Sequence, residues 1–93
     1  QADALHPAVL RLIRMVVDAA RPEDVWVGVC GGIAGDPEGA LILSGLGVDE
    51  LSMSIPAVAA VKARLRNVSM ADARRPAERA LACSTADDVR ALL

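Results

Sequence analysis

Large aromatic side chains are almost missing from this sequence, which contains one Trp and neither Phe nor Tyr. The apolar 54% of its 93 residues consists largely of Ala, Val and Leu. Small and branched side chains of this kind favour close packing of helices on a sheet. They leave little material for an independent core, because a chain of this length buries only about two-thirds of its surface on folding.

A basic surplus is also lacking, because 10 Lys and Arg oppose 12 Asp and Glu and give a net charge of -2. Such a charge does not attract nucleic acid or anionic lipid, so we expect neither as a partner. No apolar run approaches the ~20 residues that cross a bilayer. The first residues also lack the basic and then apolar order of a signal peptide. We therefore expect no membrane insertion and a cytoplasmic location.

Potential metal ligands and redox groups are few, since the chain has two Cys and one His. Cys30 and Cys83 are far apart in unlike surroundings, and a single disulfide is uncommon in a reducing compartment. We expect two free thiols. His6 stands directly before Pro7 without a second histidine nearby, which favours a place at a helix start over a catalytic base or a metal ligand. We expect no metal site in this chain.

Apolar periodicity and capping residues predict alternating helices and strands, followed by helices alone. Pro76 leaves two possibilities for the helix after Ser69, which either kinks at the proline or begins near Arg75. The expected elements are a helix over 7–20, a strand over 25–30, a helix opened by Asp36 and closed at 45–47, a strand over 51–54, and three helices that begin near Ile55, Ser69 and Thr85.

The first strand carries no alternating polar residues, which predicts that both of its faces are covered, as in a parallel sheet. A helix between two strands forms a βαβ unit, and its right-handed crossover makes the strands parallel. Two strands cannot cover their own faces and edges. We therefore expect the closing end of a longer α/β architecture whose other strands lie upstream.

Cys30 is the leading candidate for a functional residue, because it ends the first strand directly before a glycine-rich turn. Ligands of α/β folds bind at the carboxyl ends of the strands. A thiol among backbone amides is favoured as a thiolate and can exchange a proton near neutral pH. The alternative is a buried structural cysteine, a common core residue. The spacing leaves both interpretations open.

The residues around Cys30 offer fewer specific signals. The glycines after it match neither the dinucleotide-binding nor the P-loop pattern. Gly31 and Gly32 are expected to let the turn approach a ligand closely. Ser52 and Ser54 alternate on the second strand, which brings Ser54 to the same edge. It either caps the next helix or contacts a substrate, and capping is the favoured interpretation.

Three stretches of the sequence together carry a resemblance to a known family. They are His6-Pro7-Ala8-Val9-Leu10-Arg11-Leu12-Ile13, Cys30-Gly31-Gly32-Ile33-Ala34-Gly35-Asp36 and Gly45-Leu46-Gly47-Val48-Asp49-Glu50-Leu51-Ser52-Met53-Ser54. These stretches resemble the C-terminal end of Enzyme I of the phosphoenolpyruvate-dependent sugar phosphotransferase system. The Cys-Gly-Gly-Ile-Ala-Gly-Asp form is most similar to the fused multiphosphoryl transfer proteins of fructose uptake, whereas ordinary Enzyme I usually carries Glu at the position of Gly32.

The resemblance implies that residues 1–93 are a C-terminal fragment of a phosphoenolpyruvate-binding domain. The fragment would supply the last two βα units of a (β/α)8 TIM-type barrel and its C-terminal helices, which leaves the barrel incomplete. The implied enzyme moves the phosphoryl group of phosphoenolpyruvate to a protein histidine and releases pyruvate. Cys30 would be the proton donor to C3 of the enolate, with Gly31 and Gly32 as possible loop contacts to the substrate.

Other parts of that machinery are implied to lie outside these residues. They include the phosphorylated histidine, whose motif His6 does not match, the arginines that hold the substrate, and the acids that hold Mg2+. The fragment alone should therefore be inactive. The implied partners are phosphoenolpyruvate and pyruvate, an HPr-like phosphocarrier protein or domain, and a second copy of the longer protein in a homodimer.

Two other functions stay open at this point. The barrels of pyruvate phosphate dikinase and phosphoenolpyruvate synthase also end with such a cysteine. A non-catalytic module could instead use the sheet edge and the apolar helix faces for dimerisation. A redox thiol switch is disfavoured, because no second cysteine lies near Cys30 in the sequence.

Overall fold

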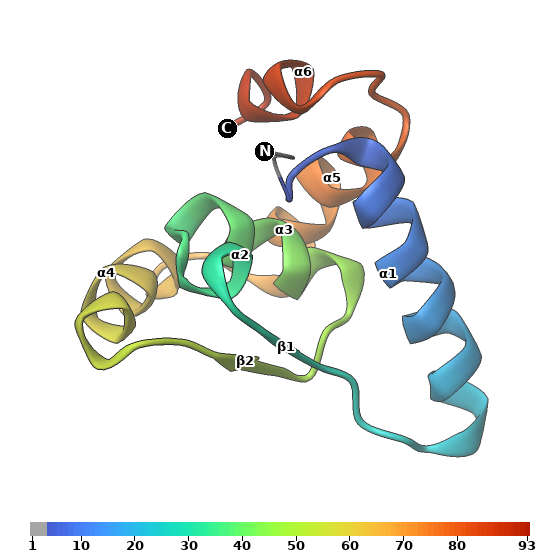
Figure 1. Cartoon of the computed structure of the whole chain (residues 1–93), viewed down its shortest axis with the longest axis horizontal. Coiled ribbons are helices and arrows are strands. Elements are labelled where there is room, and N and C mark those ends of the chain that lie inside the picture. Colours follow the sequence, from blue (N-terminus) through green and yellow to red (C-terminus); the bar gives the residue numbers. More distant parts are fainter. Residues whose placement is uncertain (1–3) are drawn as a thin grey trace.

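The computed structural model describes residues 4–93, in which two short strands lie among helices (Figure 1). The chain alternates between helix and strand as far as residue 52 and is helical from there on. Its elements are α1 (Pro7–Ala20), the 3-10 helix η1 (Arg21–Glu23), β1 (Gly28–Cys30), α2 (Gly32–Gly35), α3 (Pro37–Leu46), β2 (Glu50–Ser52), α4 (Ile55–Leu65), α5 (Met70–Leu81) and α6 (Ala86–Arg90).

The two strands form a parallel sheet, which confirms the predicted βαβ unit. Both strands are shorter than predicted. The N–H of Val25 donates to the carbonyl of Ala20, and the N–H of Val27 donates to the carboxylate of Asp49 at 2.9 Å. These bonds take the donors that a longer first strand would need for its ladder. β1 therefore begins at Gly28.

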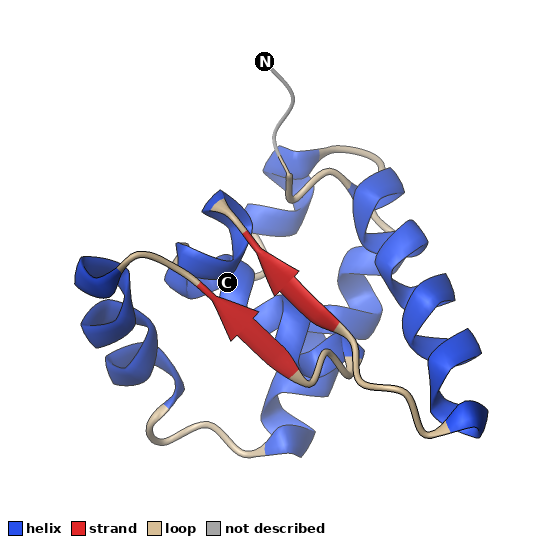
Figure 2. Ribbon diagram, turned by 60° about the horizontal axis from the view of Figure 1, so that its bottom comes forward, coloured by secondary structure: helices blue, strands red, loops and turns tan. Residues whose placement is uncertain are grey.

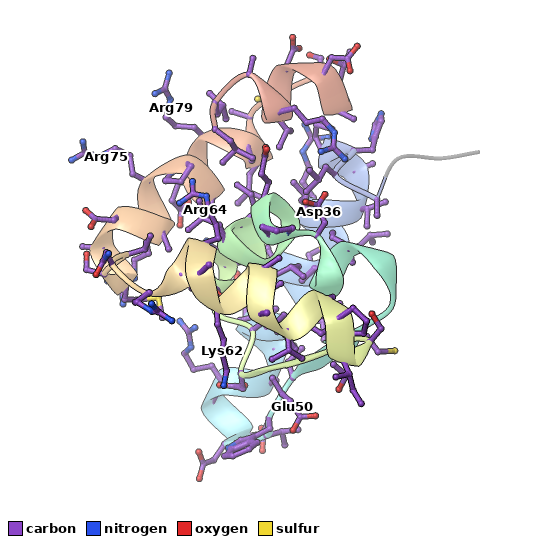
Figure 3. The ribbon with its side chains drawn as sticks, turned by 90° about the vertical axis from the view of Figure 1, so that its left-hand side faces the viewer. Asp36, Glu50, Lys62, Arg64, Arg75 and Arg79 are labelled. Carbon is purple, nitrogen blue, oxygen red and sulfur yellow. The ribbon has the colours of Figure 1, made fainter. Side chains whose placement is uncertain are left out.

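The prediction that both faces of the first strand are covered is wrong for the described chain. Gly28 and Cys30 are exposed and Val29 is half-buried, so only one face is covered. Just before the strand, Val25 and Trp26 are 57% and 76% exposed. Figure 2 shows helices behind and beside the sheet, with none in front of it. The apolar composition of residues 25–30 is typical of a strand with both faces covered, but the described residues cover only one face of β1.

α3 is the central helix of the fold, and most of its residues are buried. It packs mainly on α5, with α1 and α4 also in contact. Gly45 permits this approach, because a Cβ atom at that position would lie 2.2 Å from the carbonyl oxygen of Ala73. Small residues, which are abundant in this sequence, thus let α3 and α5 pack closely together. The main buried cluster comprises Leu5, Leu10, Ile42, Leu46, Ala77, Ala80 and Val89.

α1 uses its polar side as well as its apolar side to hold the fold together. The Arg11 guanidinium donates to the carbonyl oxygens of Leu81 and Cys83, both at 2.8 Å, and Arg14 pairs with Glu78 of α5. Only part of the apolar side of α1 is buried. Leu10 and Val17 are buried, whereas Leu12, Met15 and Val16 are more than half exposed.

The predicted helix starts are confirmed by their capping bonds. Asp36 accepts from the N–H of Glu38, and Thr85 accepts from the N–H of Asp88. Ser69 and Asp72 form the reciprocal bonds of a capping box, and Gly47 closes α3 with a φ of 100°. α5 therefore begins at Met70 and runs through Pro76, which excludes a start near Arg75.

A candidate proton-donor site at the sheet edge

Cys30 is the last residue of β1 and its side chain is exposed. Across the sheet its Cα atom pairs with that of Ser52, the last residue of β2. The carboxyl ends of both strands therefore meet beside the thiol. In the described residues the thiol is thus not buried, which differs from the structural interpretation of this cysteine.

The turn after Cys30 depends on glycine in two ways. Gly31 has a φ of 96°, which L-amino acids with side chains rarely adopt, so it lets the chain leave the strand and enter α2 directly. Gly39 then brings α3 against α2, because a Cβ atom there would lie 2.3 Å from the carbonyl oxygen of Ile33. The expected turn thus contains a short helix that α3 holds in place.

An open cavity of about 570 Å³ lies over this edge. It unites the site residues that the sequence predicted on β1, on β2 and in the glycine turn. Met53, Gly35 and Ala57 complete the lining and were not foreseen, although Met53 lies between the two predicted serines. The lining residues are Cys30, Gly31, Gly32, Gly35, Ser52, Met53, Ser54 and Ala57.

The lining contains a thiol and two hydroxyls but no basic or carboxylate side chain. At Gly31 and Gly32 an added Cβ atom would meet nothing within 4 Å, so the wall beside the thiol is open. Within residues 4–93, no three His, Cys, Asp or Glu side chains gather closely enough to hold a metal ion. The arrangement can deliver a proton and hydrogen bonds, but it cannot neutralise a multiply charged anion.

His6 and Cys83 lie outside this cavity. His6 precedes α1 and its Nδ1 accepts the N–H of Ala8 at 3.1 Å, which confirms the predicted helix start. Cys83 is half-buried after α5, and its thiol donates to the carbonyl oxygen of Arg79 at 3.5 Å. Both cysteines are free thiols, as predicted.

The difference between the two thiols predicts unequal reactivity. Cys30 should be alkylated by iodoacetamide several times faster than Cys83, because its sulfur is exposed and the other is packed and hydrogen-bonded. Mass spectrometry of the single-thiol variants Cys83→Ser and Cys30→Ser measures the two rates separately. Equal rates would contradict the placement of Cys30 at an open edge.

The cavity at the carboxyl ends of the parallel strands, which the Cys30 thiol lines, is accompanied by a family assignment. Residues 1–70 match the family described as PEP-utilising enzyme, PEP-binding domain. The chain belongs to this family.

In residues 4–93, no helix combines the length and the apolar character needed to span a membrane.

Individual relatives narrow the assignment within the family. The chain is 66% identical over 92 residues to a multiphosphoryl transfer protein of Rhodobacter capsulatus, and 60% identical over 92 residues to one of Xanthomonas campestris. It is 50% identical over 91 residues to a phosphoenolpyruvate-protein phosphotransferase of Haloferax volcanii. These alignments cover 98–99% of the chain, but only 11% of the first two relatives and 16% of the third.

Proposed function

We propose that this chain supplies the proton-donor edge of a phosphoenolpyruvate-protein phosphotransferase, with Cys30 as the donor. The observation that carries the proposal is the exposed thiol at the carboxyl ends of two parallel strands, beside an open cavity. The names of the relatives favour this enzyme over pyruvate phosphate dikinase and phosphoenolpyruvate synthase.

The proposed chemistry uses one proton from this chain. The phosphoryl group leaves phosphoenolpyruvate for a histidine outside these residues, so the P–O bond breaks and a P–N bond forms. The enolate of pyruvate remains, with its electron pair available at C3. The Cys30 thiol donates its proton to that carbon and gives pyruvate, and the thiolate then recovers a proton from water.

The substrate's negative charge requires groups that the cavity lining lacks. We propose that cationic side chains and Mg2+ act from strands outside this chain, because the described residues contain no cluster of metal ligands. When bound, such an ion offsets charge on the phosphoryl oxygens. The chain alone should therefore bind phosphoenolpyruvate poorly and not turn it over.

We further propose that residues 1–93 close a (β/α)8 barrel as its last two βα units. The uncovered face of the sheet, with Trp26 and Val25 exposed beside it, supports this architecture. Large apolar side chains exposed together are typical of a surface that packs against more protein.

The remaining parts of the proposal rest on the family alone. They are an HPr-like phosphoacceptor, a role in sugar uptake, a homodimer and a cytoplasmic location.

A chimeric enzyme tests the proposed function. The 92 residues of the Rhodobacter capsulatus relative that match this chain are replaced by the chain itself, and pyruvate release from phosphoenolpyruvate is measured with a phosphoacceptor protein present. We expect turnover within about tenfold of the unmodified relative, since 66% of the exchanged residues are identical. The matched control lacks the segment and should be inactive. A chimera that is folded by circular dichroism but does not turn over would contradict the proposal.

A further inference from the structure

Ser54 occupies the N-cap position of α4, yet its side chain makes no capping bond. A capping side chain accepts from the second or third N–H of the helix. Pro56 stands at the second position and has no N–H. The third N–H, that of Ala57, donates to the main-chain oxygen of Ser54 at 3.0 Å. The predicted capping role of the Ser54 hydroxyl is therefore wrong, because Pro56 removes one of its two possible donors and the other donates to the main-chain oxygen of Ser54 instead.

Three other polar residues at helix starts form the capping bond that the Ser54 side chain lacks. Asp36, Ser69 and Thr85 each accept a main-chain N–H at 3.1 Å through the side chain. Ser54 remains exposed, so water satisfies its hydroxyl in the free chain. A ligand can displace such a water without breaking a contact that holds the fold.

The position of Ser54 gives this hydroxyl a specific neighbour. It lies two residues beyond Ser52, which pairs with Cys30 across the sheet, and it lines the same cavity as the thiol. Residues two apart along a strand direction share a face. The hydroxyls of Ser52 and Ser54 are also the only side-chain oxygen or nitrogen groups in the cavity lining. In this cavity, hydrogen bonds to a bound ligand from side-chain oxygen or nitrogen atoms can therefore come only from these two hydroxyls.

We infer that the Ser54 hydroxyl binds the three-carbon acid whose C3 faces the Cys30 thiol, by donating a hydrogen bond to a carboxylate or enolate oxygen. This inference rests on the proposed function and adds a substrate-binding residue to it. A hydroxyl suits the task, because it donates to an anionic oxygen without adding charge to the site. The bond orients the carbon skeleton, while the thiol supplies the proton.

Ser54→Ala in the chimeric enzyme tests the inference. We expect the KM for phosphoenolpyruvate to rise about tenfold to a hundredfold, as for the loss of a hydrogen bond to a charged group, with kcat changed much less. Ser54→Thr retains the hydroxyl and should restore most of the affinity. Ser84→Ala, outside the cavity and exposed, is the matched control and should leave both constants unchanged.

Thermal unfolding separates binding from a structural role. Ser54→Ala should unfold close to the parent temperature, because no capping bond is lost. The inference is overturned by an unchanged KM, by a loss of activity that parallels a loss of stability, by failure of Ser54→Thr to rescue, or by a KM effect that appears with Ser52→Ala instead. An unchanged KM in Ser54→Ala, together with an inactive Cys30→Ala enzyme, rejects this inference and leaves the proposed function standing. A fully active Cys30→Ala enzyme rejects the proposed function itself.

Discussion

Cys30→Ala in the chimeric enzyme lowers kcat for pyruvate release by about 10²- to 10⁴-fold, the range expected when a positioned proton donor is removed. The KM for phosphoenolpyruvate changes little, because the thiol acts on the enolate after the phosphoryl group has left. The expected result is a large change in turnover with little change in substrate binding. Steady-state kinetics with a pyruvate-coupled assay measures both constants.

Cys83→Ala is the matched control for this variant, since it removes the other thiol away from the cavity. It should keep its turnover, although the loss of a half-buried sulfur can lower stability slightly. Cys30 is exposed, so its replacement should leave the unfolding temperature nearly unchanged. If the Cys30→Ala enzyme releases pyruvate at the parent rate, another group donates the proton.

Gly45→Ala produces the largest loss of stability that we expect from a single methyl group. Its Cβ atom would lie 2.2 Å from the carbonyl oxygen of Ala73 and 2.7 Å from the Cβ atom of Ala77, so α3 and α5 must separate. Overpacking of this kind costs about 3 kcal/mol or more, against a gain of about 1 kcal/mol in helix propensity. A net loss of about 2 kcal/mol lowers the unfolding temperature of a chain this size by about 8–16 °C.

Thermal unfolding of the 93-residue chain, followed by far-ultraviolet circular dichroism, measures this effect. Gly32→Ala is the matched control, because a Cβ atom there meets nothing within 4 Å. It should unfold within a few degrees of the parent chain. Equal unfolding temperatures for the Gly45→Ala chain and the parent would mean that α3 and α5 can separate at little cost.

Local chemistry made the helices predictable. Asp36, Ser69 and Thr85 each bond to a main-chain N–H within three residues, so a short window of sequence contains both partners of these three caps. The turn at Gly47 is also predictable from local chemistry, because its positive φ favours glycine at the end of a helix. Such signals do not depend on the rest of the fold.

Long-range contacts account for what the sequence did not predict about the fold. The first strand is shortened in part by the bond from the N–H of Val27 to the carboxylate of Asp49, 22 residues away in the sequence. Arg11 and Arg14 look like solvent-facing residues in the periodicity of α1, yet both bind α5. No window of sequence contains these partners, so periodicity could not reveal them.

The candidate site was predictable where it depends on the strand ends, and not where it depends on how distant helices pack. Cys30 and Ser52 could be assigned to one sheet edge, because parallel strands bring their carboxyl ends together. Ala57 lines the cavity only because α4 packs beside α2. The two helices are so close there that a Cβ atom added at Gly35 would lie 3.3 Å from the Cβ atom of Ala57. The sequence contains one signal against a cap at Ser54, since Pro56 lacks one of the two N–H groups from which its hydroxyl could accept.

The two hydrogen bonds of Arg11 also bear on how the chain is made. They join the first helix to the carbonyl oxygens of Leu81 and Cys83, about 70 residues later. During synthesis residues 81–83 leave the ribosome well after α1, so these two bonds can form only when the intervening helices have been made.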